Sequence, residues 1–114
     1  MSQRISPQTL YVLRNDLRIN SVIQVLEIPW KKDDMKFRFI CPQCHGLDTS
    51  THSKTNLGRC FSCQKNFNTI DMVMVKKGYA FRQAVDWLLI IKKTLGTDDG
   101  QSLLTRLALR TRIN

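Results

Sequence analysis

The chain has 114 residues, of which 42% are hydrophobic and 24% are charged. This composition is typical of one globular domain and excludes a largely disordered chain, and the length leaves no room for a polymerase or nuclease domain beside another module. Eighteen Lys and Arg residues against nine Asp and Glu residues give a net charge of +9. Such an excess favours a polyanionic partner, most often nucleic acid, although a basic surface without a binding role is the alternative.

Apolar runs in the sequence are short. The longest covers residues 87–91, far below the roughly 20 residues that cross a bilayer. The first seven residues contain no apolar segment of the kind found in secretory signals. We therefore expect a cytoplasmic protein with no membrane partner, in which the four cysteines stay reduced.

The first third of the chain has a helical pattern. Ser6 is a suitable N-cap and Pro7 a suitable first helical residue, and leucines follow at every third or fourth position. A second short helix should begin after a cap at Asn20 or Ser21. Pro29 should end it.

Helical patterns return after residue 67. Asn68 or Thr69 can cap a helix over residues 70–77, and Gly78 suits the position just past its end. Two further helices are expected over residues 80–93 and 102–112, separated by a break at 96–100.

The middle third reads as turns and short strands. Residues 31–34 have the composition of a polar turn, and residues 36–40 alternate in the manner of a strand. A second strand is expected over residues 57–61. Between residues 41 and 67 the chain is rich in Gly, Asn, Ser and Thr, so a hydrophobic core alone cannot organise it.

Four cysteines form two CxxC motifs in this segment. Cys41 and Cys44 are followed, after fifteen residues, by Cys60 and Cys63. This spacing is typical of a zinc ribbon, in which four thiolates surround one tetrahedral ion about 2.3 Å away. Four protein ligands leave no open position for water, which predicts one structural Zn²⁺.

Other uses of the cysteines are open. Two disulfides would need an oxidising compartment, a redox CxxC pair would need only one motif, and four thiolates could hold an iron–sulfur cluster. His45 could replace Cys44 as a ligand, whereas His52 lies in the intervening loop and is more easily explained as a surface or strand residue.

The motifs and their flanking helices resemble the N-terminal zinc-binding domain of bacterial DnaG-type DNA primases. The resemblance covers about residues 15 to 91. It rests on Cys41-Pro42, on Cys60-Phe61-Ser62-Cys63, and on the helical residues 70–74, Gly78, Phe81 and 84–88. It implies a domain that binds single-stranded template and helps to choose where priming starts.

The chain departs from this family in three respects. Cys44 stands where the family usually has His, and Thr49-Ser50-Thr51 lacks the family's central proline. The family's catalytic domain, with its clustered metal-binding carboxylates, is missing from these 114 residues. We therefore expect no enzymatic activity and no small-molecule substrate.

Basic residues gather around the cysteines. Residues 31–66 carry seven basic and three acidic side chains, a net charge of +4. The candidate nucleic-acid contacts are Lys36, Arg38, Lys54, Arg59, Phe61 and Lys65. On the first strand the two phenylalanines should face the core and Lys36 and Arg38 the phosphates, while Phe61 could stack on a base.

Each candidate also has an explanation without nucleic acid. Arg59 and Lys65 could offset the negative charge of a zinc tetrathiolate, and Phe61 could pack against the helices. Trp30 and Trp87 are expected in the core rather than on a binding surface.

The predicted fold is α+β, a zinc ribbon with a small antiparallel β-sheet flanked by α-helices. Residues 1–30 form an N-terminal helical segment that packs on the ribbon, residues 31–95 the primase-like ribbon domain, and residues 96–114 a helical tail. The predicted function is to bind single-stranded DNA and assist a separate primase or polymerase in priming, as in a plasmid, phage or other mobile element. The alternative is a module that docks a replicative helicase or polymerase with little direct DNA binding.

Overall fold

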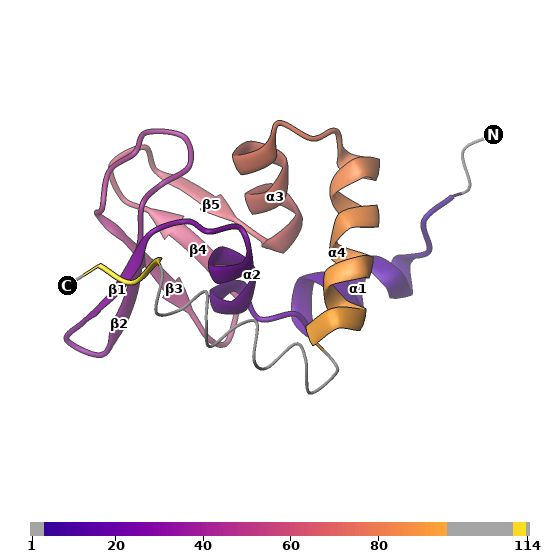
Figure 1. Ribbon diagram of the computed structural model, residues 1–114, viewed down its shortest axis with the longest axis horizontal. Helices are drawn as coiled ribbons and strands as arrows, with labels where there is room; N and C mark the ends of the chain where they lie inside the picture. Colours follow the sequence, from indigo (N-terminus) through magenta and orange to yellow (C-terminus); the bar gives the residue numbers. More distant parts are fainter. Residues whose placement is uncertain (1–3, 96–110, 114) are drawn as a thin grey trace.

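The computed structural model describes residues 4–95 and 111–113 (Figure 1). The helices are α1 (Pro7–Asn15), α2 (Ile19–Val25), α3 (Thr69–Lys77) and α4 (Phe81–Leu95). The strands are β1 (Trp30–Asp33), β2 (Lys36–Phe39), β3 (Thr49–His52), β4 (Leu57–Cys60) and β5 (Lys65–Phe67). The strands lie at one end of the molecule and α1 and α4 at the other, with α2 and α3 between them. The predicted α+β ribbon is confirmed.

Local capping signals explain α1 and α3. The Ser6 hydroxyl accepts a hydrogen bond of 3.1 Å from the backbone N–H of Thr9, and Pro7 opens α1, as predicted. Asn68 forms a capping box with Asp71, and Gly78 ends α3 with a φ of 69°.

The start of α2 was predicted wrongly. The helix begins at Ile19, with Arg18 as an N-cap whose side chain makes no capping hydrogen bond. The backbone N–H of Ile19 instead donates to the side chain of Asn56, which lies in the turn between β3 and β4. A residue distant in sequence therefore partners the first N–H of the helix, so Asn20 and Ser21 are not needed as caps.

The strands form two antiparallel sheets, β1–β2 and β3–β4–β5. The predicted polar turn at residues 31–34 is wrong, because residues 30–33 are β1 and the turn is Asp34-Met35. Trp30 in β1 stacks on Phe37 in β2 with ring centroids 4.9 Å apart, and this buried pair explains why a strand with a polar surface forms there. β3 and β5 were not predicted.

A threonine joins the two sheets. The Thr49 hydroxyl of β3 accepts a hydrogen bond of 2.8 Å from the Phe39 N–H and donates one of 2.5 Å to the Phe39 carbonyl. The ring of Phe39 lies over Gly58 of β4, where a Cβ would come within 3.0 Å of it. The two sheets therefore act as one support for the cysteine loops.

One hydrophobic core connects the helices and the strands. It contains residues from α1 and α2 as well as from β2, β4, β5, α3 and α4. Trp30 is buried and Trp87 is half-buried, as expected of core residues. The predicted helix at 102–112 lies almost wholly outside the described residues, but Ile113 donates a hydrogen bond to the Trp30 carbonyl beside β1. No helix within the described residues is both long enough and apolar enough to span a membrane.

Candidate metal centre and nucleic-acid surface

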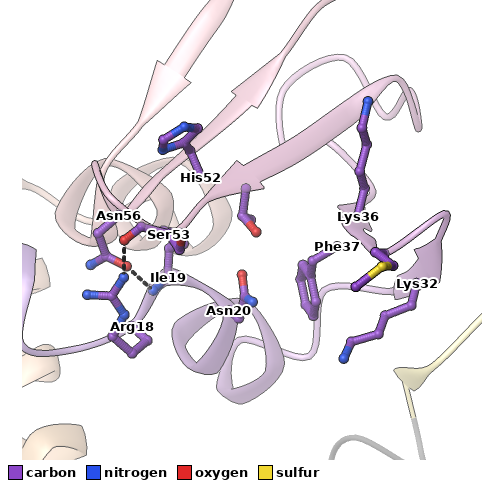
Figure 2. A pocket seen from close by; sticks show the side chains of 11 residues that line it. Arg18, Ile19, Asn20, Lys32, Lys36, Phe37, His52, Ser53 and Asn56 are labelled. Carbon is purple, nitrogen blue, oxygen red and sulfur yellow. Dashed lines mark hydrogen bonds between the residues drawn. The ribbon is translucent and has the colours of Figure 1, made fainter.

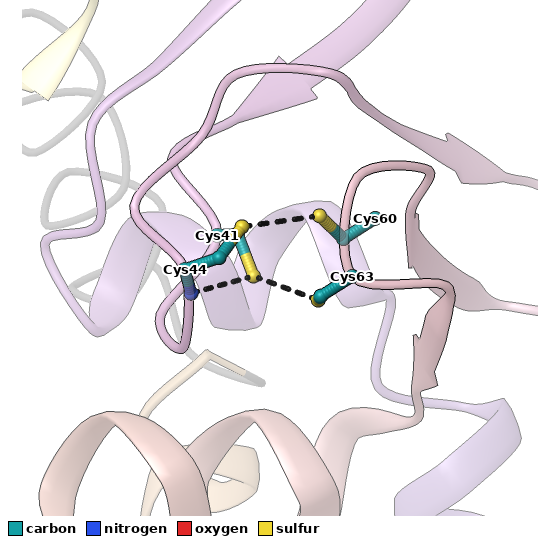
Figure 3. Close-up of side chains that lie close together, drawn as sticks. All are labelled: Cys41, Cys44, Cys60 and Cys63. Carbon is teal, nitrogen blue, oxygen red and sulfur yellow. Dashed lines mark hydrogen bonds between the residues drawn. The ribbon is translucent and has the colours of Figure 1, made fainter.

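The four cysteines come from two loops that the strands bring together (Figure 3). The first loop follows β2 and carries Cys41 and Cys44. The second begins at Cys60, the last residue of β4, and reaches Cys63 before β5. Because Thr49 pairs with Cys60 in the β3–β4 register, the end of the first loop is fixed beside the start of the second.

Backbone hydrogen bonds shape the first loop. The Cys41 N–H donates to the Gly46 carbonyl and the His45 N–H to the Cys41 carbonyl, both at 2.9 Å. The Cys44 N–H points at the Cys41 sulfur from 3.5 Å. His45 and Gln64, each directly after the second cysteine of its motif, have φ values of 64° and 57°. The two loops thus turn in the same way after their cysteines.

The sulfur atoms are spaced for a tetrahedral metal. The Cys41 and Cys63 sulfurs are 3.8 Å apart, those of Cys44 and Cys60 are 3.5 Å apart, and all four lie within 4.8 Å of one another. Ligands about 2.3 Å from a tetrahedral Zn²⁺ are separated by about 3.8 Å. The chemistry and the spacing of this donor set both fit zinc.

The thiols differ in their readiness to ionise. Burial alone would raise the pKa of Cys60, but hydrogen bonds from the Cys63 backbone N–H and the Cys44 thiol outweigh it and lower the pKa to about 7. Burial, followed by hydrogen bonding to Cys60, raises the pKa of Cys63 to about 12. A metal that binds here must therefore displace protons.

The site has a closed side and an open side. Cys41 and Cys60 are fully buried against the core, whereas Cys44 is exposed. His45 is also exposed, and the metal-ligating group found among the described residues consists of the four cysteines without it. The set of four thiolates is therefore preferred to one in which His45 replaces Cys44.

A family model described as "CHC2 zinc finger", the zinc ribbon of DnaG, matches residues 5–100 of the chain. The chain belongs to this family. The CHC2 match agrees with the predicted resemblance and makes the chain a zinc-binding domain of the replication-priming kind. Comparison with the curated proteins and with the solved structures gave no match.

The two basic residues of β2 in this CHC2 domain differ in their surroundings. Phe37 and Phe39 are buried, so the opposite face of β2 carries Lys36 and Arg38, as predicted. Lys36 is exposed. Arg38 is only 24% exposed, and its Nη1 donates to the Thr49 carbonyl at 3.1 Å while its Nε lies 3.4 Å from the Asp33 carboxylate. Arg38 therefore ties β2 to β3, whereas Lys36 is available to a ligand.

Arg59 and Phe61 lie together at the second cysteine loop. The guanidinium of Arg59 is 5.5 Å from the centre of the Phe61 ring, and its Nη1 is 3.3 Å from the Asn66 side-chain oxygen. Phe61 is 47% exposed, so it does not pack into the core. The pair offers a flat aromatic face and a cation at the surface.

The remaining two candidates lie elsewhere on the ribbon. Lys54 is exposed in the turn between β3 and β4. Lys65 is exposed in β5, but strand alternation places it on the opposite face from Arg59, and it lines a hollow with Asp71 of α3. Arg59 and Lys65 therefore do not share one surface.

Sequence reasoning missed the basic hairpin. Reading residues 31–34 as a turn concealed a strand whose register pairs Lys32 with Phe37 and Asp33 with Lys36, so Lys32 and Lys36 project from opposite faces of the hairpin. Residues 30–33 show no alternation, since one buried Trp is followed by two Lys and an Asp, so the sequence carried no periodic signal for this strand. Asn20, expected as a cap, instead faces a groove beside this hairpin.

Proposed function

We propose that this CHC2 domain is a non-catalytic DNA-binding protein that holds one structural zinc ion. It presents single-stranded DNA to a separate primase or polymerase during replication priming. The family supplies the link to priming, and the net charge of +9 supplies the attraction to DNA. Because four thiolates complete a tetrahedral zinc, no position is left for a catalytic water.

The observation that carries this proposal is the exposed pair of Phe61 and Arg59. Unpaired bases stack on exposed aromatic rings, and a cation beside such a ring can contact the neighbouring phosphate. Phe61 lies between the two cysteines of the second loop, so a metal held by these cysteines would fix the position of the ring. Zinc would thus promote DNA binding by holding the Phe61 ring in position, without contacting the DNA itself.

Fluorescence anisotropy with labelled single-stranded and duplex DNA tests the proposal. Zinc-loaded protein should bind the single strand more tightly, and binding should weaken with salt in proportion to the phosphates contacted. Phe61→Ala should weaken single-strand binding about fivefold or more. Phe81→Ala is the matched control, because Phe81 is 44% exposed on α4, away from the ribbon. Equal effects of the two substitutions would contradict the proposal.

A docking role has one observation in its favour. On α4, Leu89 and Ile90 are exposed, with Ile90 at 64%. Under this alternative the domain binds a helicase or polymerase through α4 and touches DNA weakly. Failure of the zinc-loaded protein to bind single-stranded DNA even at low salt would favour the docking role. Ile90→Glu should then abolish partner binding.

A further inference from the structure

A groove of about 370 Å³ lies beside the β1–β2 hairpin (Figure 2), and none of the four cysteines lines it. One wall is the hairpin, from which Lys32 and Lys36 project in opposite directions, and the other is formed by the start of α2 and the end of β3. Its size falls within the range of sites for small ligands, of roughly 300–1,000 Å³. Neither the family match nor the Phe61 surface accounts for it.

The groove is positively charged. Arg18, Lys32 and Lys36 line it, and no Asp or Glu is among its lining residues. Arg18 is held in place, since its guanidinium donates to the carbonyls of Asn15 and Ser53. Lys32 and Lys36 are exposed, and no hydrogen bond or ion pair joins them to the described part of the chain. Two lysines are therefore available for an anionic ligand.

The opposite wall offers a polar group without a partner. The Oδ1 atom of Asn20 is buried and makes no hydrogen bond to the described residues. Buried polar atoms in folded proteins are nearly always satisfied, so an unsatisfied one needs an explanation. An Asn amide carries a donor and an acceptor, which together match the edge of a nucleobase.

Met35, in the turn of the hairpin, is the third unusual feature of the groove. Asp34 and Met35 have φ values of 49° and 65°, and Met35 is 99% exposed. Two-residue turns of this kind favour Asn-Gly, because other side chains are strained in the left-handed region. The fold gains no contact from this thioether, but apolar side chains including Met do insert between bases in protein–DNA complexes.

We propose that this groove seats one nucleotide of a single-stranded DNA. Lys32 and Lys36, which project from opposite faces of the hairpin, each hold the phosphate on their own side of the nucleotide. The Asn20 amide reads the base edge, and Met35 packs on the face of the base. This inference rests on the proposed function and adds a second contact site, at the hairpin, to the one at Phe61. The available groups match the parts of a nucleotide: the lysines complement the charge of a phosphate, the amide can hydrogen-bond to a base, and the apolar Met35 side chain can pack on its face.

The test compares Met35→Gly with Gln64→Gly. Both replace an exposed, neutral residue that has a positive φ, so both should raise the melting temperature. Only Met35→Gly should weaken binding of single-stranded DNA, by about fivefold. A purely structural role for Met35 would not produce higher stability together with lower affinity. Oligonucleotides carrying 5-iodouracil should also form photo-crosslinks to Met35, located by mass spectrometry.

Charge variants complete the experiment. Lys32→Glu should weaken binding and reduce its salt dependence, whereas Lys93→Glu, at the far end of α4, should do so less. If Phe61→Ala weakens binding while Met35→Gly and Lys32→Glu do not, the groove does not bind a nucleotide, and the proposed function is unaffected. If zinc-loaded wild-type protein binds no single-stranded DNA, both are wrong.

Discussion

Asn56 caps α2 from 37 residues away, because its Oδ1 accepts a 2.8 Å hydrogen bond from the backbone N–H of Ile19. Its Nδ2 donates to the carbonyls of Arg14 and Leu17, at 2.6 and 2.7 Å. Asn56 is 1% exposed and has a φ of 55°, a conformation that asparagine tolerates better than most residues. One side chain therefore fixes the ribbon to the junction between α1 and α2.

Replacement of Asn56 by Ala should be strongly destabilising. It would leave one buried N–H and two carbonyls without partners, at a cost of about 2–4 kcal/mol in the free energy of unfolding. Asn56→Asp keeps the acceptor for Ile19 but loses both donors, so its effect should also be large. Urea denaturation measures both, with the exposed Asn66→Ala as control. A loss below about 1 kcal/mol for Asn56→Ala would contradict this account.

Gly58→Ala should destabilise the protein through a steric clash. An added Cβ would lie 3.0 Å from the Cζ atom of Phe39 and 3.2 Å from the Cε atom of Met72. Overpacking of a core costs about 1–3 kcal/mol. At Gly46 the nearest atom would be 3.4 Å away, so Gly46→Ala should be milder. Thermal melting of the zinc-loaded variants compares them, and equal shifts would show that the contact with Phe39 does not matter.

Zinc affinity should rise steeply with pH. The pKa of Cys63 is raised to about 12 and that of Cys60 lowered to about 7 in the metal-free site, so at neutral pH a metal must displace protons from several thiols. Acidification restores those protons and weakens binding, whereas a rise in pH favours the thiolates. Competition with a chromogenic chelator between pH 5.5 and about 8 measures the slope.

Substitution at the metal site shows whether Cys44 or His45 is the metal ligand. Cys44→Ser should greatly weaken binding, whereas His45→Ala should leave the affinity and its pH dependence unchanged, because His45 is outside the cysteine cluster. Titration with Co²⁺ reports the coordination through its visible spectrum. A change in that spectrum for His45→Ala would show that His45 is a ligand.

Substitutions of Arg38 and Lys36 should have different effects, the first mainly on stability and the second mainly on DNA binding. Arg38→Ala removes a hydrogen bond to the Thr49 carbonyl and should lower the free energy of unfolding by about 1–2 kcal/mol. Lys36→Ala should change stability by less than about 0.5 kcal/mol and weaken DNA binding instead. Denaturation and anisotropy on the same samples check both. Equal stability of the two variants would show that Arg38 does not join β2 to β3.

Features that depend on nearby residues could be predicted from the sequence. The caps at Ser6 and Asn68, the helix end at Gly78 and the cysteine spacing each involve residues within a few positions of one another, or a ligand set with a fixed geometry. The alternation in β2 correctly placed its phenylalanines in the core.

Features that depend on distant residues could not be predicted in this way. The first N–H of α2 has its partner in the β3–β4 turn, so local caps were misleading. β1 depends on the stacking of Trp30 on Phe37 across the hairpin, which outweighs its polar composition. The engagement of Arg38 by Thr49 likewise appears only once β2 and β3 are adjacent.

The hydrogen bonds between Thr49 and Phe39 have a consequence for how the domain opens. They close the base of the loop formed by residues 40–48 without any help from the metal. Loss of zinc should therefore release this loop as a separate cooperative unit while the strands on either side stay paired. In hydrogen–deuterium exchange, the amides of Cys41 and His45 should lose protection on chelation, and that of Phe39 should keep it. Loss of the metal would then unfold one loop locally while the rest of the domain stays folded.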